Sequence, residues 1–138
     1  SNHKIEALKK LCATYNLHVI APIVNVKGEF CYKCNAHFSP KSVHFFEQQF
    51  LINYKHWNEE KFFANAIAKY TLPTFMHNGF RFGIVSGYEL HFDAVWTEVM
   101  KKNVDVVCID KVEDAQAIFQ RIQEFKKRFF EGSDVTCE

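Results

Sequence analysis

The sequence predicts an α+β fold: a mixed sheet of about five or six strands packed by four or five helices. Three observations support this prediction. The spacing of hydrophobic residues alternates along the chain between the helical period and the strand period of two. Turn dipeptides, above all Asn78-Gly79, separate the short strands. The length of 138 residues suits one domain, so we predict a single domain over residues 1–138.

The N-terminal part predicts a helix followed by a β-hairpin. Ile5, Leu8, Cys12 and Tyr15 recur at a spacing that places them on one helical face. Two stretches rich in strand-forming residues, 17–26 and 29–37, flank Lys27-Gly28, which is a turn signal. We therefore expect a hairpin over residues 17–37.

Residues 39–73 predict two further helices. Ser39-Pro40 has the pattern of a helix start, with serine as the N-cap and proline at the first helical position. The apolar stripe that follows consists of Val43, Phe46, Phe50, Leu51 and Tyr54. Asn58 is expected to cap a second helix that runs through Phe63, Ala66, Ile67 and Tyr70 and ends at Leu72-Pro73.

From Thr74 onward the hydrophobic period becomes two. Asn78-Gly79 and Ser86-Gly87 predict two hairpin turns, and hence a three-stranded meander over residues 74–77, 80–85 and 88–92. Asp93 then caps a short helix that ends at Asn103. The almost wholly apolar stretch 104–109 predicts a central strand covered on both faces. Asp110 and Glu113 precede a long amphipathic helix closed by Gly132, and residues 133–138 form a loose tail.

Composition excludes several classes of protein. Hydrophobic residues make up 48% and charged residues 24%, which is typical of a globular protein. Seventeen Lys/Arg against sixteen Asp/Glu give a net charge of +1, so nucleic-acid binding is only weakly supported. No apolar stretch approaches the length of a membrane span, and we predict no membrane partner. The five cysteines, an odd number, favour reduced thiols in a cytoplasmic protein. Residues 1–2 resemble the remnant of an expression tag.

One motif has metal-ligand spacing. Cys31 and Cys34 form a C-x-x-C motif, and His37 follows it. The alternation of apolar residues at 30, 32, 34, 36 and 38, however, predicts a straight strand, in which residues three apart lie on opposite faces. We therefore predict no metal, with Cys31, Cys34 and His37 as the candidate ligands of a zinc ion if one is bound.

The predicted meander contains one candidate catalytic face. With two-residue turns, His77, Glu89 and His91 share a sheet face with aromatic side chains. His77 and His91 would lie roughly 12 Å apart, too far to share one ion. Glu89 and His91 would lie about 7 Å apart on one strand, close enough to flank a ligand.

The leading functional hypothesis is a non-catalytic intracellular binding or assembly domain, as a whole protein or as a fragment of one. It rests on the absence of nucleotide-binding and nucleophile motifs and on aromatic doublets such as Phe129-Phe130, which indicate a protein partner or self-association. No cofactor is predicted. The first alternative is a small enzyme or ligand-binding domain that uses His77, Glu89 and His91. The second is a zinc-supported nucleic-acid-binding module.

Overall fold

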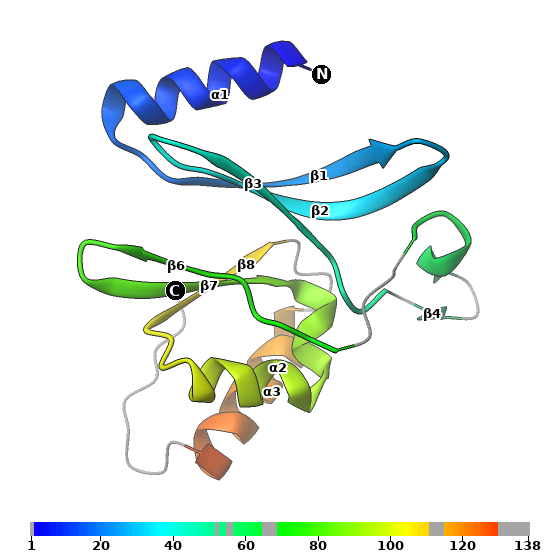
Figure 1. Cartoon of the computed structure of the whole chain (residues 1–138). Helices are drawn as coiled ribbons and strands as arrows, with labels where there is room; N and C mark the ends of the chain where they lie inside the picture. Colours follow the sequence, from blue (N-terminus) through cyan, green and yellow to red (C-terminus); the bar gives the residue numbers. More distant parts are fainter. Residues whose placement is uncertain (1, 52, 55–56, 65–68, 111–114, 130–138) are drawn as a thin grey trace. The chain divides into compact units, whose positions relative to one another are not determined.

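The computed structural model describes residues 2–51, 53–54, 57–64, 69–110 and 115–129. Helices and strands are mixed, so the α+β class is confirmed (Figure 1). The chain divides into two compact units, Ser1–Ile67 and Ala68–Glu138. The single domain over residues 1–138 stays a prediction, and each unit is described separately.

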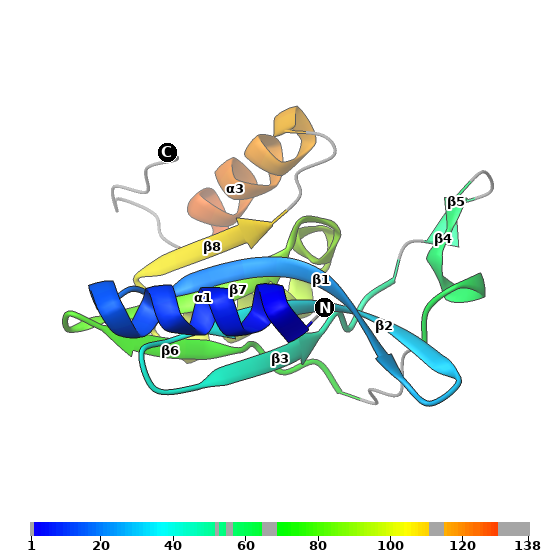
Figure 2. The same ribbon diagram turned by 90° about the horizontal axis from the view of Figure 1, so that it is seen from above.

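Unit 1 consists of a helix packed on an antiparallel sheet. The helix α1 (Asn2–Tyr15) precedes β1 (Val19–Lys27), β2 (Phe30–Phe38) and β3 (Val43–Glu47), and the strand order is β1-β2-β3 (Figure 2). Cys12 of α1 packs with Ala36 and Phe38 of β2, and Ile5 and Leu8 contact the same cluster. The predicted helix and hairpin are confirmed, each boundary lying within a few residues of its expected position.

The first predicted helix after the hairpin is wrong, because residues 43–47 form the strand β3. Ser39 and Pro40 lie in the turn between β2 and β3, where the Ser39 amide donates to the Ser42 carbonyl at 2.8 Å. Serine and proline favour the first positions of a tight turn as strongly as a helix start. The β-branched and aromatic residues that follow then pair with β2, with His37 opposite His44.

The second predicted helix is reduced to a single turn. The strands β4 (Asn53–Tyr54) and β5 (Trp57–Asn58) form a short ribbon before the 3₁₀ turn η1 (Glu59–Lys61). Asn58 is a cap, as predicted, since its side chain accepts a hydrogen bond from the Glu60 amide at 3.0 Å. The helix does not continue through Phe63 or Tyr70. Ala66 and Ile67 lie outside the described residues.

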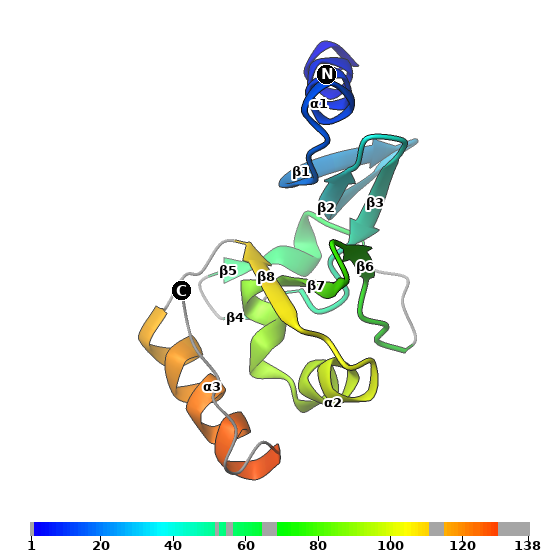
Figure 3. The same cartoon turned by 90° about the vertical axis from the view of Figure 1, so that its left-hand side faces the viewer.

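Unit 2 combines a three-stranded sheet with two helices. Its elements are β6 (Thr74–His77), β7 (Phe80–Ser86), the 3₁₀ turn η2 (Gly87–His91), α2 (Asp93–Lys101), β8 (Val106–Asp110) and α3 (Ala115–Phe129). Figure 3 shows these strands together with α2 and α3. β6 and β7 are antiparallel, whereas β7 and β8 are parallel. The Asn78-Gly79 turn is confirmed: both residues have positive φ, 51° and 80°.

Two predictions for unit 2 are wrong. Residues 88–92 do not form a third meander strand, because the chain turns into η2 after Ser86 and the Glu89 carboxylate accepts a hydrogen bond from the Ser86 amide at 3.2 Å. The apolar strand near residues 104–109 is confirmed as β8, but β7 holds the middle of the described sheet. Among the described residues, the predicted single sheet is replaced by two three-stranded sheets and the two-stranded ribbon of β4 and β5, and there are three α-helices instead of four or five. Glu113, Gly132 and residues 133–138 lie outside them.

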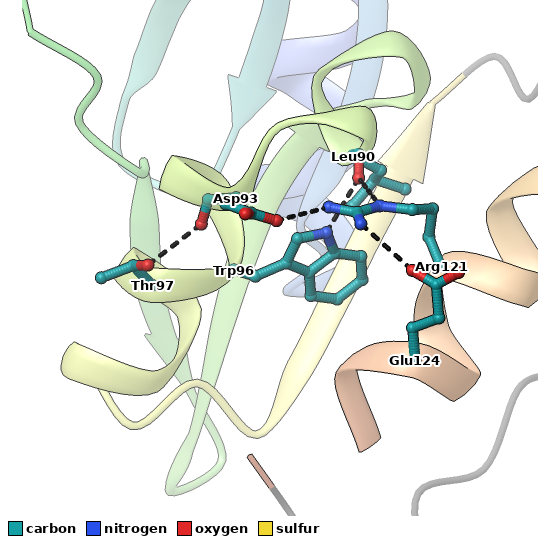
Figure 4. A network of polar contacts seen from close by, with 6 residues as sticks. All are labelled: Leu90, Asp93, Trp96, Thr97, Arg121 and Glu124. Carbon is teal, nitrogen blue, oxygen red and sulfur yellow. Dashed lines mark hydrogen bonds and ion pairs between the residues drawn. The ribbon is translucent and has the colours of Figure 1, made fainter. Parts of the chain in front are cut away.

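The helices of unit 2 are joined to η2 by a polar network (Figure 4). The Trp96 indole donates to the Leu90 carbonyl at 2.8 Å, and the Arg121 guanidinium pairs with Asp93 at 2.8 Å. Trp96 also packs against Phe125, with ring centroids 4.5 Å apart. Residues from η2, α2 and α3 thus meet at one point, which positions the turn that follows β7.

Replacing Phe38 by alanine is expected to destabilise unit 1 by about 3–5 kcal/mol, because it opens a cavity beneath α1. Phe38 is 1% exposed, whereas Phe30 at the other end of β2 is 59% exposed. Denaturant unfolding of Phe38→Ala and of the control Phe30→Ala measures the difference. Equal losses for the two variants would show that the α1–β2 packing is not the core of this unit.

Candidate active site

The two faces of β2 have different chemistry. One face carries Ala36 and Phe38, which pack in the cluster with Cys12 of α1, and also the buried Cys34. Phe30, at the start of the same face, is exposed, so the predicted inward-facing set is confirmed only for its second half. By the same alternation, Lys33, Asn35 and His37 share the opposite face. Asn35 and His37 are buried, and Lys33 is mostly so. Burying a row of polar side chains on a strand costs free energy unless they have hydrogen-bonding partners, so this face is a candidate functional site.

The centre of this face is an ion pair between Lys33 and Glu59. The Lys33 ammonium donates to Glu59 Oε2, and the two side chains are 19% and 1% exposed. Gln48 Nε2 donates to Glu59 Oε1 at 3.4 Å and to the Phe50 carbonyl at 2.7 Å. The carboxylate is therefore held through both oxygens. The Lys33 nitrogen also lies 5.9 Å from the centre of the Phe63 ring.

Glu59 reaches β2 through a strap, which we define as the described residues 48–51, 53–54 and 57–64. The Gln48 amide donates to the Lys33 carbonyl at 2.7 Å, and the Ala64 amide donates to the Cys31 carbonyl at 2.8 Å. Both ends of the strap are thus attached to β2 within two residues of each other. Between them, the Asn58 cap starts η1 at Glu59, and the Phe62 and Phe63 amides donate to the Glu59 carbonyl.

This arrangement can support acid–base and electrostatic chemistry. A lysine ammonium has three N–H donors, and Glu59 orients the group. An oriented ammonium in a largely water-excluded site stabilises a developing negative charge more strongly than one in water. Since a buried ion pair adds little to stability compared with apolar packing, a functional role is a good explanation for this pair.

The predicted zinc ligands do not come together. Cys31 and Cys34 lie on opposite faces of β2 by its alternation, and His37 hydrogen-bonds to His18. Within the described part of the chain, no three His, Cys, Asp or Glu side chains gather in a way that could hold a metal ion.

The predicted face of His77, Glu89 and His91 is not formed. Glu89 is buried in η2, while His91, two residues later, is exposed and its ring contacts Tyr88. His77 ends β6, with its ring 6.4 Å from that of Phe82. The cause is the 3₁₀ turn, because it removes the period of two on which the shared face depended. A catalytic role for any of the three stays a prediction.

The carboxyl ends of the parallel strands β7 and β8 form a second polar location, in unit 2. Ser86 and Asp110 are partners in the register, and Glu89 returns to the Ser86 amide. Burial, followed by the charges of Glu89 and Glu98, raises the pKa of Tyr70 well above its usual range, so its hydroxyl keeps its proton. Open sheets bind ligands beyond the carboxyl ends of parallel strands.

The described cysteines are free thiols in different surroundings. Cys12 is fully buried between α1 and the sheet. Burial raises the pKa of the Cys34 and Cys108 thiols. A buried, protonated thiol is a poor nucleophile. Cys31 lies two residues before Lys33 on β2 and is partly exposed. Cys137 lies outside the described residues.

Lys33, Gln48 and Glu59 were not predicted from the sequence. Lys33 has only a weak signal in the sequence. It is a charged residue on the polar face of a strand whose other face is regularly apolar. Glu59 has no signal of its own, because an acidic residue after an N-cap is ordinary at a helix start.

Comparison with solved structures identifies the fold. The chain is similar to the glutamine-dependent NAD+ synthetase of Acinetobacter baumannii, solved with ADP, with a TM-score of 0.70 and 19% identity over 92% of this chain and 25% of that one. It is also similar to an amidase from Nesterenkonia sp. AN1. A mutant of that amidase in complex with butyramide gives a TM-score of 0.62 and 11% identity, over 78% of this chain and 41% of that one.

A further structure of the Nesterenkonia AN1 amidase, described as a member of the nitrilase superfamily, gives a TM-score of 0.62 at 12% identity, over 86% of this chain and 47% of that one. The chain therefore spans a quarter to just under half the length of these proteins. At such identities the likeness establishes the fold alone. No protein-family model matches the sequence, and no curated protein does either.

These findings correct the leading functional hypothesis. A non-catalytic binding or assembly domain was expected because familiar catalytic motifs are absent, but the solved structures to which this chain is similar include an NAD+ synthetase and an amidase from the nitrilase superfamily. The zinc-supported nucleic-acid module is corrected on the same ground. The expectation relied on local motifs, and these do not reveal contacts between distant residues such as Lys33 and Glu59, which are 26 positions apart. As for a membrane, none of the helices in the described residues is long and apolar enough to cross one.

The variant Lys33→Met is expected to lose about 3–5 kcal/mol of stability, because it leaves the Glu59 carboxylate buried without its cation. The double variant Lys33→Met/Glu59→Leu should recover much of this loss, since no unpaired charge remains. Chemical denaturation of the three proteins measures both changes. The control is Lys27→Met, which breaks the far more exposed Lys27–Glu47 pair and should change little. A double variant as unstable as Lys33→Met would contradict the assignment.

Proposed function

We propose that this chain is part of an enzyme that hydrolyses carbon–nitrogen bonds of amides, with the Lys33–Glu59 pair in its active site. The observation that carries the proposal is the burial of this ion pair on the polar face of β2. The fold supports it, since the similar structures include an amidase solved with butyramide. Another structure of that amidase contains acrylamide added to the active-site cysteine.

The chemistry of amide hydrolysis fits the pair. Attack on the amide carbon places negative charge on the carbonyl oxygen, and the departing nitrogen needs a proton. The Lys33 ammonium can donate a hydrogen bond to that oxygen or a proton to that nitrogen, while Glu59 orients it. Glu59 is 1% exposed, so we assign it to positioning Lys33.

A thiol nucleophile would have to meet two requirements, namely access to the substrate and a stabilised thiolate. Cys12, Cys34 and Cys108 are disfavoured by burial or by a raised pKa. Cys31 is the described cysteine that belongs to the Lys33 face of β2. The proposal therefore treats Cys31 as the thiol to be tested and leaves the other three in structural roles.

The test is ammonia release from short amides, with butyramide, acrylamide and glutamine as substrates. The Lys33→Met variant is expected to lose 100-fold or more in kcat/KM, about the contribution of one acid–base group. Glu59→Gln, which keeps the shape of the side chain, should reduce kcat through a misplaced ammonium. Cys31→Ser reports whether that thiol takes part.

The matched control is Lys27→Met, an exposed lysine at the end of β1 in the same sheet. It should leave hydrolysis unchanged. Circular dichroism of each variant confirms that it is folded. No hydrolysis by the unaltered chain, or equal rates for Lys33→Met and Lys27→Met, would overturn the proposal.

A further inference from the structure

Three histidines from neighbouring segments of unit 1 lie side by side. His37, in the middle strand β2, is the direct register partner of His44 in β3. On its other side, His37 Nε2 lies 2.9 Å from His18 Nδ1, and the two rings stack with centroids 5.2 Å apart. We call His18, His37 and His44 the histidine ladder. It lies on the polar face of β2, away from α1.

The ladder sits at the connection between α1 and β1. The helix ends at Tyr15, and Asn16 takes a positive φ of 53°, while the Leu17 amide donates to the Cys12 carbonyl at 3.0 Å. His18 is the residue directly before β1. Its bond to His37 therefore attaches the start of β1 to the middle strand at the point where the chain leaves the helix.

The bond between two imidazole nitrogens depends on protonation. One nitrogen must carry a hydrogen atom and the other must offer a lone pair. The hydrogen bond is therefore possible when both rings are neutral and when one of them is protonated. A second proton makes both nitrogens donors and places two cations 2.9 Å apart. Full protonation therefore breaks the bond. His44, opposite His37, adds a further positive charge to the same face when it is protonated.

We propose that the histidine ladder is an acid-sensitive fastener, which holds the start of β1 on β2 at neutral pH and releases it in acid. The proposal rests on the alignment of the three histidines across the strands and on the burial of His37, which is only 5% exposed. His18 and His44, on the segments at either side of β2, both disfavour a positive charge on His37. The proposal concerns the conformation of unit 1 and does not depend on amide hydrolysis.

The direction of the effect follows from His37. Burial, and then the charges of His18 and His44, lower the pKa of His37 to about 4 from 6.5. His37 therefore binds a proton more readily when its bond to His18 is broken than when that bond is formed. The form with the His18–His37 bond keeps the full stabilising contribution of His37 above pH 6.5. This contribution is lost as the pH falls from 6.5 to 4, and it does not change further below pH 4.

Hydrogen exchange of the whole chain, corrected for the intrinsic pH dependence of exchange, tests the fastener. Amides of residues 16–20 are expected to open about 50- to 100-fold more often at pH 4.5 than at pH 7.5. In His37→Gln this ratio should shrink to a few-fold, since glutamine can bond to His18 without titrating. The control is His3→Gln, an exposed position on α1, which should keep the full response.

A second measurement covers the case in which His37→Gln does not fold. Ring ¹⁵N chemical shifts of the unaltered protein should show His37 neutral at pH 5, and His18→Gln should raise its titration midpoint. An opening rate of residues 16–20 that does not change with pH would overturn the proposal. So would a His37 ring that titrates near 6.5 in the unaltered protein, or a full acid response in His37→Gln.

Discussion

The structure of unit 1 depends on one constraint: a carboxylate that is 1% exposed must have its charge matched by a cation. Lys33 supplies that cation from the middle of β2, and Gln48 satisfies the second carboxylate oxygen. Both ends of the strap bond to the backbone of β2 beside Lys33, which brings Glu59 to its cation. The same constraint holds the Lys33 ammonium in place and partly shielded from water, which is what the proposed active site requires.

One strand serves two purposes because side chains alternate along it. On one face, Ala36 and Phe38 form the core beneath α1 together with Cys12. The other face carries Lys33, Asn35 and His37, which need hydrogen bonds or ion pairs to be buried. The apolar face stabilises the strand, and this stability is what allows the polar face to hold a charged centre and a histidine row.

Part of the site was within reach of sequence analysis and part was not. The alternation over residues 30–38 correctly placed Cys31 and Cys34 on opposite faces, and thus separated the two thiols of the C-x-x-C motif. Glu89 was singled out, but its environment was misjudged. A Ser-Gly pair after a strand fits a hairpin and a 3₁₀ turn equally well, and the bond from the Ser86 amide to Glu89 decides between them. Ser39-Pro40 was ambiguous in the same way, since pairing with β2 outweighed the helix-start signal.

The sequence by itself determined what depends on neighbours along the chain: the amphipathic helices α1, α2 and α3, the Asn78-Gly79 turn and the hairpin of β1 and β2. Local periodicity and turn chemistry carry that information. Only the tertiary structure decided which segments pair and which charges meet. The pairing of Lys33 with Glu59, the parallel alignment of β7 with β8 and the row of His18, His37 and His44 all join residues distant in sequence. Desolvation and cross-strand packing set these contacts, and they act only once the chain has folded.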